Sequence, residues 1–347
     1  MGLPEIFIAF ETAAVSAITR SARGAVALVL SDDTPQAPVT AAYQSLADVP
    51  ADAFSAENYR LLGLAFRAAP AKVYVVRVQE EEQQAVFDAL NKLSFNWLAA
   101  PALDSETVVS YVKERRAAGI AVKAVVANAE APDHEGIVNL CASGLELSDG
   151  AIETQDYTAR IAGLLAALPL TQSATYAPLA EVVACDAPER PDEDIDQGKL
   201  IIVQGRGSYR LGRAVNSLTT LTPSKAAPFQ KIKIVEGIDL IQTDIAATFE
   251  NAYIGKVLND YDSKLLLVTA INAYFQELEG DVLDKTADNR CAVSLSGQKH
   301  YLESQGTDTM DMDDAQILRA NTGSQVFLEA KLTFCDAMED LALEISM

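Results

Sequence analysis

The stretch AVALVL, residues Ala25–Leu30, is a continuous apolar run. A run without alternation predicts a strand buried on both faces, as in the parallel sheets of α/β proteins. A helix is predicted over residues 56–66, because the apolar residues between Leu61 and Phe66 recur at helical spacing. Pro70 ends this helix, and Lys72–Val78 (KVYVVRV) reads as the next strand. The three elements predict a β-α-β unit.

Residues 83–168 repeat the alternation of helix and strand. The predicted elements are a helix over Gln83–Lys92, a strand from Trp97, a helix over Glu106–Ala118 capped by Asp104 or Ser105 and ended by Gly119, a strand over Val122–Ala127, a helical turn over Asp133–Asn139 and a helix over Asp156–Leu168. We interpret 83–168 as an inserted, smaller outer α/β domain. It interrupts a discontinuous middle α/β domain made of residues 21–80 and 169–196.

Residues 181–196 contain seven acidic residues and two prolines, which is typical of a boundary loop. A mixed-sheet C-terminal domain is predicted beyond it, over residues 197–335. Its predicted elements are a hairpin of Leu200–Val203 and Tyr209–Leu211, a strand over Lys231–Val235, helices over Gly237–Glu250 and Ser263–Leu278, a strand over Cys291–Leu295, helical turns over Gln298–Gln305 and Met310–Ala320, and an alternating strand over Val326–Phe334. The fold class is therefore α/β and α+β, with more than one domain.

Both ends of the chain carry the period-2 pattern of a half-buried strand. Ile6, Ile8 and Phe10 share one face near the start, and Leu341, Leu343 and Ile345 share one face near the end. Because an unpaired strand recruits another chain, we expect these six residues to make contacts between subunits. Residues 1–20 and 336–347 are then two extended β-arms, and the chain is a building block.

The composition limits the partners. The net charge is −22, from 49 acidic and 27 basic residues, and such a surface repels nucleic acid and anionic membrane. The four cysteines lie far apart without a CxxC pair, and no apolar stretch has the length of a membrane span. These features predict a reduced, cytoplasmic chain that does not insert into a membrane.

Motifs for catalysis or ligand binding are missing from the sequence. His134 and His300 have no second ligand pair at metal-binding spacing, and no GxSxG, HExxH or GxxxxGK[ST] pattern occurs. Gly205-Arg206-Gly207 lies between two predicted strands and reads as a hairpin turn. We therefore expect no catalytic, cofactor-binding or metal-binding residue. An α/β enzyme or nucleotide-binding domain with an oligomerising tail stays open as the alternative function.

Several ordered segments carry a family resemblance. They are GLPEIFIAF (2–10), AVSAITRSARGAVALVL (14–30), LPLTQSATYAPL (168–179), DIDQGKLII (194–202), RAVNSLTTLT (213–222), KIKIVEGIDLIQTDI (231–245), AINAYFQELE (270–279), NTGSQVFLEAKL (321–332) and DAMEDLALEISM (336–347). With these segments the chain resembles the sheath protein of contractile phage tails, in the short form of myophages and Gram-positive prophages. The match is weakest over residues 80–153. Another phage structural protein, such as a tail adaptor, is the third possibility.

The resemblance implies a virion structural protein of a bacteriophage or prophage, or of another contractile injection system. Such subunits form homo-hexameric rings that stack into a helical sheath around an inner tail tube, with the C-terminal domain beside the tube and the arms adding strands to neighbouring subunits. The implied partners are further copies of the chain, the tail tube protein, and the baseplate and tail terminator proteins, with no nucleic acid and no cofactor. The implied location is the host bacterial cytoplasm during assembly and then the tail of the particle. Contraction would drive the tube through a cell envelope.

Overall fold

The structure is a computed structural model that describes residues 17–78 and 83–347. The predicted strand with Ile6, Ile8 and Phe10 lies outside the described residues. The chain divides into two compact units. Among the described residues, the large unit consists of Ser21–Thr243 with Asp336–Met347, and the small unit consists of Asp244–Cys335 with residues 17–20.

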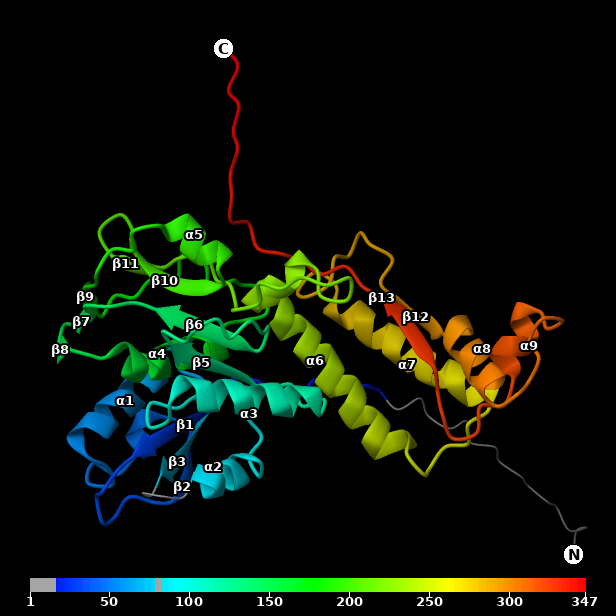
Figure 1. The fold of residues 1–347 in the computed structure, drawn as a ribbon, viewed down its shortest axis with the longest axis horizontal. Helices are drawn as coiled ribbons and strands as arrows, with labels where there is room; N and C mark the ends of the chain where they lie inside the picture. Colours follow the sequence, from blue (N-terminus) through cyan, green and yellow to red (C-terminus); the bar gives the residue numbers. More distant parts are fainter. Residues whose placement is uncertain (1–16, 79–82) are drawn as a thin grey trace, which may run out of the picture. The chain divides into compact units, whose positions relative to one another are not determined.

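An eight-stranded sheet runs through the large unit in the order β11-β10-β6-β5-β4-β1-β3-β2 (Figure 1). Its strands are β1 (Ala25–Ser31), β2 (Thr40–Tyr43), β3 (Lys72–Val78), β4 (Trp97–Ala99), β5 (Lys123–Ala127), β6 (Ile137–Cys141), β10 (Lys199–Gln204) and β11 (Tyr209–Leu211). The six central strands are parallel, and the outer strands β2 and β11 pair antiparallel to their neighbours. The predicted mixed α/β fold class is confirmed.

Helices cover both faces of this sheet (Figure 1). The helical elements of the large unit are α1 (Ala56–Phe66), α2 (Gln83–Leu90), α3 (Ser105–Ala117), α4 (Thr154–Ala167), α5 (Pro191–Asp196) and the 3-10 turns η1 (Leu46–Asp48) and η2 (Ala227–Gln230). Val26 and Leu28 of β1 belong to the core under α1 and α4, whereas Ala27 and Val29 belong to the core under α2 and α3. The strand is therefore buried on both faces, as its unbroken apolar run predicts.

The sheet crosses the borders that the sequence suggested for an inserted domain at residues 83–168. β4 pairs with β1 on one side, and β6 pairs with β10 on the other. The strands β4, β5 and β6 of this block therefore fill the middle of the common sheet. The predicted boundary loop also contains structure, namely α5 and the strand β9 (Val182–Ala184), which joins β7 (Glu146–Leu147) and β8 (Gly150–Ala151) in a three-stranded sheet.

Two further local predictions are wrong. The predicted helical turn over Asp133–Asn139 gives way to β6, where Asn139 exchanges two side-chain hydrogen bonds with the backbone of Ala129, at 2.8 and 2.9 Å. The predicted strand over Lys231–Val235 is the first turn of α6 (Ile232–Thr248). A short alternation of apolar residues is compatible with a strand or with a helix. In the folded chain the buried residues of this segment recur at helical spacing, and the segment is helical.

The small unit contains the end of α6, the π-helical turn η3 (Phe249–Tyr253), α7 (Tyr261–Leu278), α8 (Leu295–Ser304), α9 (Asp314–Arg319) and the strands β12 (Arg290–Val293) and β13 (Leu328–Lys331). β13 is shorter than the strand predicted over Val326–Phe334, and its Ala330 is exposed where the alternation placed it inside. Across residues 17–78 and 83–347, no helix combines the length and apolar character that crossing a bilayer requires.

Candidate functional site

The small unit contains a sheet of two strands. β12 and β13 pair antiparallel, with Cys291 opposite Ala330. The Asn272 side chain of α7 covers the outer edge of β12. Its amide nitrogen donates to the Cys291 carbonyl at 3.0 Å, and its oxygen accepts from the Cys291 amide at 2.7 Å. Asn272 thus takes the place of a neighbouring strand and closes this edge.

The outer edge of β13 is open. The Ser294 amide donates to the Phe327 carbonyl at 2.9 Å, which identifies these two residues as a hydrogen-bonded pair. Because such pairs alternate along an antiparallel ladder, Leu328 and Ala330 direct their backbone groups away from β12. Within the described part of the chain, no strand pairs with this edge. An open edge of this kind accepts an added strand.

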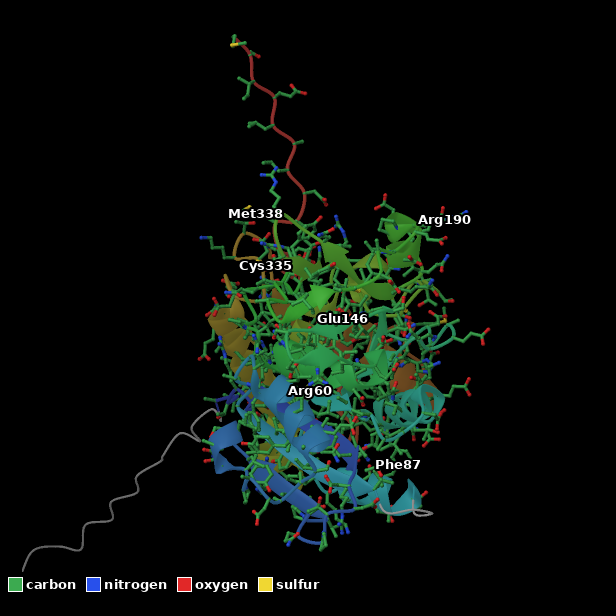
Figure 2. The ribbon with its side chains drawn as sticks, turned by 90° about the vertical axis from the view of Figure 1, so that its left-hand side faces the viewer. Arg60, Phe87, Glu146, Arg190, Cys335 and Met338 are labelled. Atoms are coloured by element: carbon green, nitrogen blue, oxygen red, sulfur yellow. The ribbon has the colours of Figure 1, made fainter. Side chains whose placement is uncertain are left out.

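The carboxyl-terminal segment, residues 336–347, is attached to the large unit by its acidic residues. Glu339 accepts hydrogen bonds from Thr175 at 2.6 Å and Ser173 at 3.0 Å. Arg213 forms ion pairs with Glu339 at 3.1 Å and with Asp340 at 2.7 Å. The label of Met338 in Figure 2 marks this attached part. The base of the segment is therefore held in place.

Beyond Asp340 the segment runs as an extended line without a partner (Figure 1). Leu341, Leu343 and Ile345 are 88%, 71% and 77% exposed. The strand predicted here is not formed in the single chain, since a strand needs a hydrogen-bonded neighbour and the described residues supply none. The contacts predicted for these residues and for Ile6, Ile8 and Phe10 stay a prediction.

A groove beside α7, which we name the α7 groove, is a feature that sequence reasoning missed. It has a volume of about 590 Å³. Its lining includes the side chains of Phe249, Tyr253, Leu258, Asn259, Lys264, Leu267 and Val326. Lys264 is almost fully buried, and burial lowers the pKa of its ammonium group. In the sequence, the signal that could have indicated this groove is Lys264, a lysine at an otherwise apolar helix position.

The large unit holds a buried ionic cluster. Asp239 on α6 receives two hydrogen bonds from Arg116 at 2.9 Å each and one from Lys123 at 2.7 Å. Lys123 also lies 3.2 Å from Glu236. The two cations hold the pKa of the Asp239 carboxyl below its usual range. The cluster joins α6 to α3 and β5, so its role is structural.

His134 is partly buried near this cluster, and its Nδ1 accepts a hydrogen bond from the Gly136 amide at 3.0 Å. Burial, helped by the cations of Arg116 and Lys225, lowers its pKa to about 4 although Glu135 opposes the shift. Folding therefore favours the neutral form of the His134 imidazole. In the unfolded chain, the pKa of this group is near its ordinary value of about 6.5.

This difference makes a pH-dependent contribution to stability. It is complete above about pH 6.5 and falls as the pH drops toward 4, because protonation favours the unfolded chain. We expect the wild type to lose more unfolding free energy between pH 7.5 and 4.5 than His134→Asn, whose amide oxygen can still accept from Gly136. Urea unfolding at the two pH values measures this. Equal losses in both proteins would contradict it.

The described residues bring no three His, Cys, Asp or Glu side chains together in a way that could hold a metal ion. Gly205–Gly207 lies in the antiparallel β10–β11 hairpin, as expected. Asp32, at the carboxyl end of β1, accepts from the Ser55 amide at 2.9 Å and the Asn58 amide nitrogen at 2.7 Å. Asp32 thus connects β1 to the start of α1.

Comparisons with known proteins agree with one another. A family model described as the phage tail sheath C-terminal domain matches residues 224–347. The chain is 34% identical over 365 aligned positions to the tail sheath protein of Clostridium phage phiCD119, covering 100% of this chain and 99% of the relative. It is also 31% identical over 169 positions to the phage-like element PBSX protein XkdK of Bacillus subtilis, covering 44% of this chain and 34% of that protein.

Solved structures share the fold. The sheath tail protein of Desulfitobacterium hafniense superposes with a TM-score of 0.69 at 16% identity, covering 83% of this chain and 93% of that one. A subunit of the contracted helical sheath of the anti-feeding prophage gives 0.71 at 14% identity, covering 100% and 99%. With the full-length sequence relationship to the clostridial phage protein, the chain belongs to the tail sheath protein family, whose members are structural subunits of contractile tails and not enzymes.

Proposed function

We propose that copies of this chain polymerise around an inner tail tube by inter-subunit strand exchange, and that contraction of the resulting sheath drives the tube through a cell envelope. The observation that carries the proposal is a complementary pair of features. β13 has an open edge, and the carboxyl-terminal segment exposes a row of apolar side chains in an extended stretch without a partner. The helical sheath of the anti-feeding prophage, whose subunit shares this fold, supports such an assembly.

The energetics favour a lattice over a stable dimer. Burial of Leu341, Leu343 and Ile345 contributes roughly 1.5–3 kcal/mol each, and each ladder hydrogen bond adds about 1 kcal/mol. Ordering the strand costs roughly 1–2 kcal/mol per residue, which offsets much of this gain. A single arm therefore binds weakly. In a lattice several arms hold each subunit, and their high local concentration makes the combined attachment strong.

The proposed partners are further copies in stacked hexameric rings, the tail tube protein, and the baseplate and tail terminator proteins. Assembly takes place in the bacterial cytoplasm, and the finished subunit lies in the tail of the particle. The anti-feeding prophage baseplate, which contains a subunit of this fold with a TM-score of 0.65 at 13% identity, supports the baseplate contact. The net charge of −22 keeps free subunits apart until arms and lattice contacts outweigh the repulsion.

Removal of Leu341–Met347 tests the proposal. These residues are exposed and unpaired, so we expect the melting temperature to change by about 1 °C or less. Polymers seen by sedimentation velocity and negative-stain microscopy should be lost. Leu343→Pro, which removes a ladder N–H, should act in the same way, whereas Ala342→Ser should assemble normally. Sheaths of normal length from the truncated protein would refute strand exchange through this arm.

A further inference from the structure

We propose that a pocket at the carboxyl end of α3 is a binding site for a small tetrahedral oxyanion of the phosphate class. The pocket, which we name the α3 pocket, lies within the large unit and has a volume of about 380 Å³. This volume is in the range of small-molecule sites. The polar side chains of its lining come from α3, the loop before β6, the loop before η2 and α6: Lys113, Arg116, His134, Glu135, Lys225 and Gln242.

Basic side chains gather at this pocket, although the chain as a whole has a net charge of −22. Arg116 is already engaged by Asp239, and Lys225 donates to both oxygens of Glu135 at 2.7 and 2.8 Å. Lys113 has no carboxylate of the described residues within ion-pair distance. Its charge is therefore unbalanced, and an anion in the pocket would neutralise it.

The lining offers several hydrogen-bond donors to such an anion. Nδ1 of His134 accepts from the Gly136 amide at 3.0 Å, so the neutral imidazole carries its proton on Nε2. An ammonium has three protons, and Lys225 uses two of them on Glu135, which leaves one. Lys113 adds a further ammonium. An oxyanion accepts from several donors at once, and charge-assisted bonds of this kind are the strong ones.

The electrostatics of His134 indicate that the cations of the lining converge. Burial lowers the pKa of the imidazole, and the charges of Arg116, Lys225 and Lys113 lower this pKa further, although Glu135 opposes the shift. The interaction between charges weakens with distance, so all three cations act on one imidazole only if they lie near it. The positive charges and the Nε2 donor therefore surround the same space.

The loop that carries His134 is held in place by the segment 216–220. Asp133 Oδ1 accepts from the Thr219 amide at 2.7 Å and from the Thr220 amide at 2.9 Å. The Ser217 hydroxyl donates to the His134 carbonyl at 3.0 Å. These bonds stabilise Asp133 in a left-handed conformation with a φ of 42°. The imidazole is thus positioned before an anion arrives, which reduces the entropy lost on binding.

Histidine NMR tests the site directly, because the chain has only two histidines, His134 and His300. Full-length protein with carbon-13-labelled histidine is titrated at pH 7.5 with inorganic phosphate, and chloride at equal ionic strength is the control. We expect the Cε1–H signal of His134 to shift saturably with phosphate and not with chloride. His300, on α8 of the small unit, should not respond. Equal effects of phosphate and chloride on His134 would overturn the proposal.

Charge variants locate the bound anion. Lys113→Gln should weaken phosphate binding about fivefold, whereas Lys113→Arg, which keeps the charge, should retain it. Lys92→Gln is the matched control, because it also removes one exposed lysine charge from the large unit but lies outside the lining. Both positions are exposed, so the variants should fold normally. Equal affinities of Lys113→Gln and Lys92→Gln would contradict binding in the α3 pocket.

Thermal unfolding gives a second measurement. An anion that binds the folded chain stabilises it by mass action, so the melting temperature should rise with phosphate and then level off. The general stabilising effect of phosphate on proteins is shared by all variants. The difference between Lys92→Gln and Lys113→Gln therefore reports the site alone, and the rise should be smaller for Lys113→Gln. An identical rise in both variants would overturn the site.

An acidic side chain of a second copy is the competing occupant. It would make the His134 signal depend on protein concentration in phosphate-free solution, and it would block phosphate at high protein concentration. Either result would overturn a free anion as the occupant. The inference goes beyond the proposed function and does not depend on strand exchange, so a chain that fails to polymerise but binds phosphate at His134 would contradict only the proposed function.

Discussion

Replacement of Gly163 by alanine is expected to destabilise the large unit strongly. Gly163 lies in α4, where an added Cβ would be 2.0 Å from the carbonyl oxygen of Ala65 and 2.8 Å from its carbonyl carbon. Both atoms belong to the backbone of α1, so no side-chain rotation relieves the clash, and the helices must separate. We expect a loss of about 3 kcal/mol or more, which lowers the melting temperature by roughly 10 °C.

Gly63→Ala is the matched control, because it also adds one methyl group to a glycine in a helix. Its nearest neighbour is Leu46 Cδ2 at 3.6 Å, an ordinary contact. Alanine in α1 should therefore stabilise the helix by about 0.5–1 kcal/mol. Circular dichroism melting of the two variants measures the contrast. Similar melting temperatures for both would contradict the close approach of α1 and α4.

Asp239→Ala is expected to have a comparably large effect, because it leaves two buried cations without their main partner. Arg116 and Lys123 both donate to this carboxylate, and Lys123 is only 2% exposed. Removing one member of a buried ion pair typically costs about 3–5 kcal/mol. Asp239→Asn, which keeps an acceptor oxygen but not the charge, should fall between the wild type and the alanine variant.

The control for charge removal is Glu193→Gln. Glu193 pairs with Arg190 at 3.0 Å on the surface, where the side chains are 61% and 71% exposed. Such a pair contributes less than about 1 kcal/mol. Urea unfolding at pH 7 should therefore separate Glu193→Gln clearly from Asp239→Ala, and equal losses would contradict a structural role for the cluster.

The pH dependence of the Asp239 effect has a defined sign. The carboxyl has a pKa below its usual range, so its stabilising effect is present above about pH 4 and is lost as the pH falls through the lowered folded-state pKa. The difference between wild type and Asp239→Ala should therefore shrink on acidification. A difference that grows below pH 4 would contradict this linkage.

Local patterns in the sequence were sufficient for much of the large unit. The unbroken apolar run at Ala25–Leu30 and the helical spacing in Ala56–Phe66 depend on residues close in the chain, and both elements form where predicted. Asp104 caps α3 by accepting from the Thr107 amide at 2.8 Å, and Gly119 follows the helix with a φ of 82°. A cap needs only neighbouring residues, so sequence reasoning finds it.

The division into domains could not be predicted in the same way. An inserted α/β domain and a continuation of one α/β sheet have the same alternation of helix and strand. Only the pairing of β4 with β1 and of β6 with β10 shows that residues 83–168 belong to the common sheet. Strand order depends on contacts between distant residues, and alternation along the chain does not encode it.

The sequence by itself determined the α/β character of the chain, its acidic surface and the apolar row of Leu341, Leu343 and Ile345, because composition and period-2 spacing are local properties. Only the tertiary structure decided which edge of the small sheet is open, since Asn272 closes β12 from 19 residues away. It also decided that Lys264 lies in a groove, bonded to Thr322 across 58 residues. Such contacts arise when helices and strands pack, so the open edge and the groove depend on packing, whereas the apolar row near the end of the chain can be found from local spacing alone.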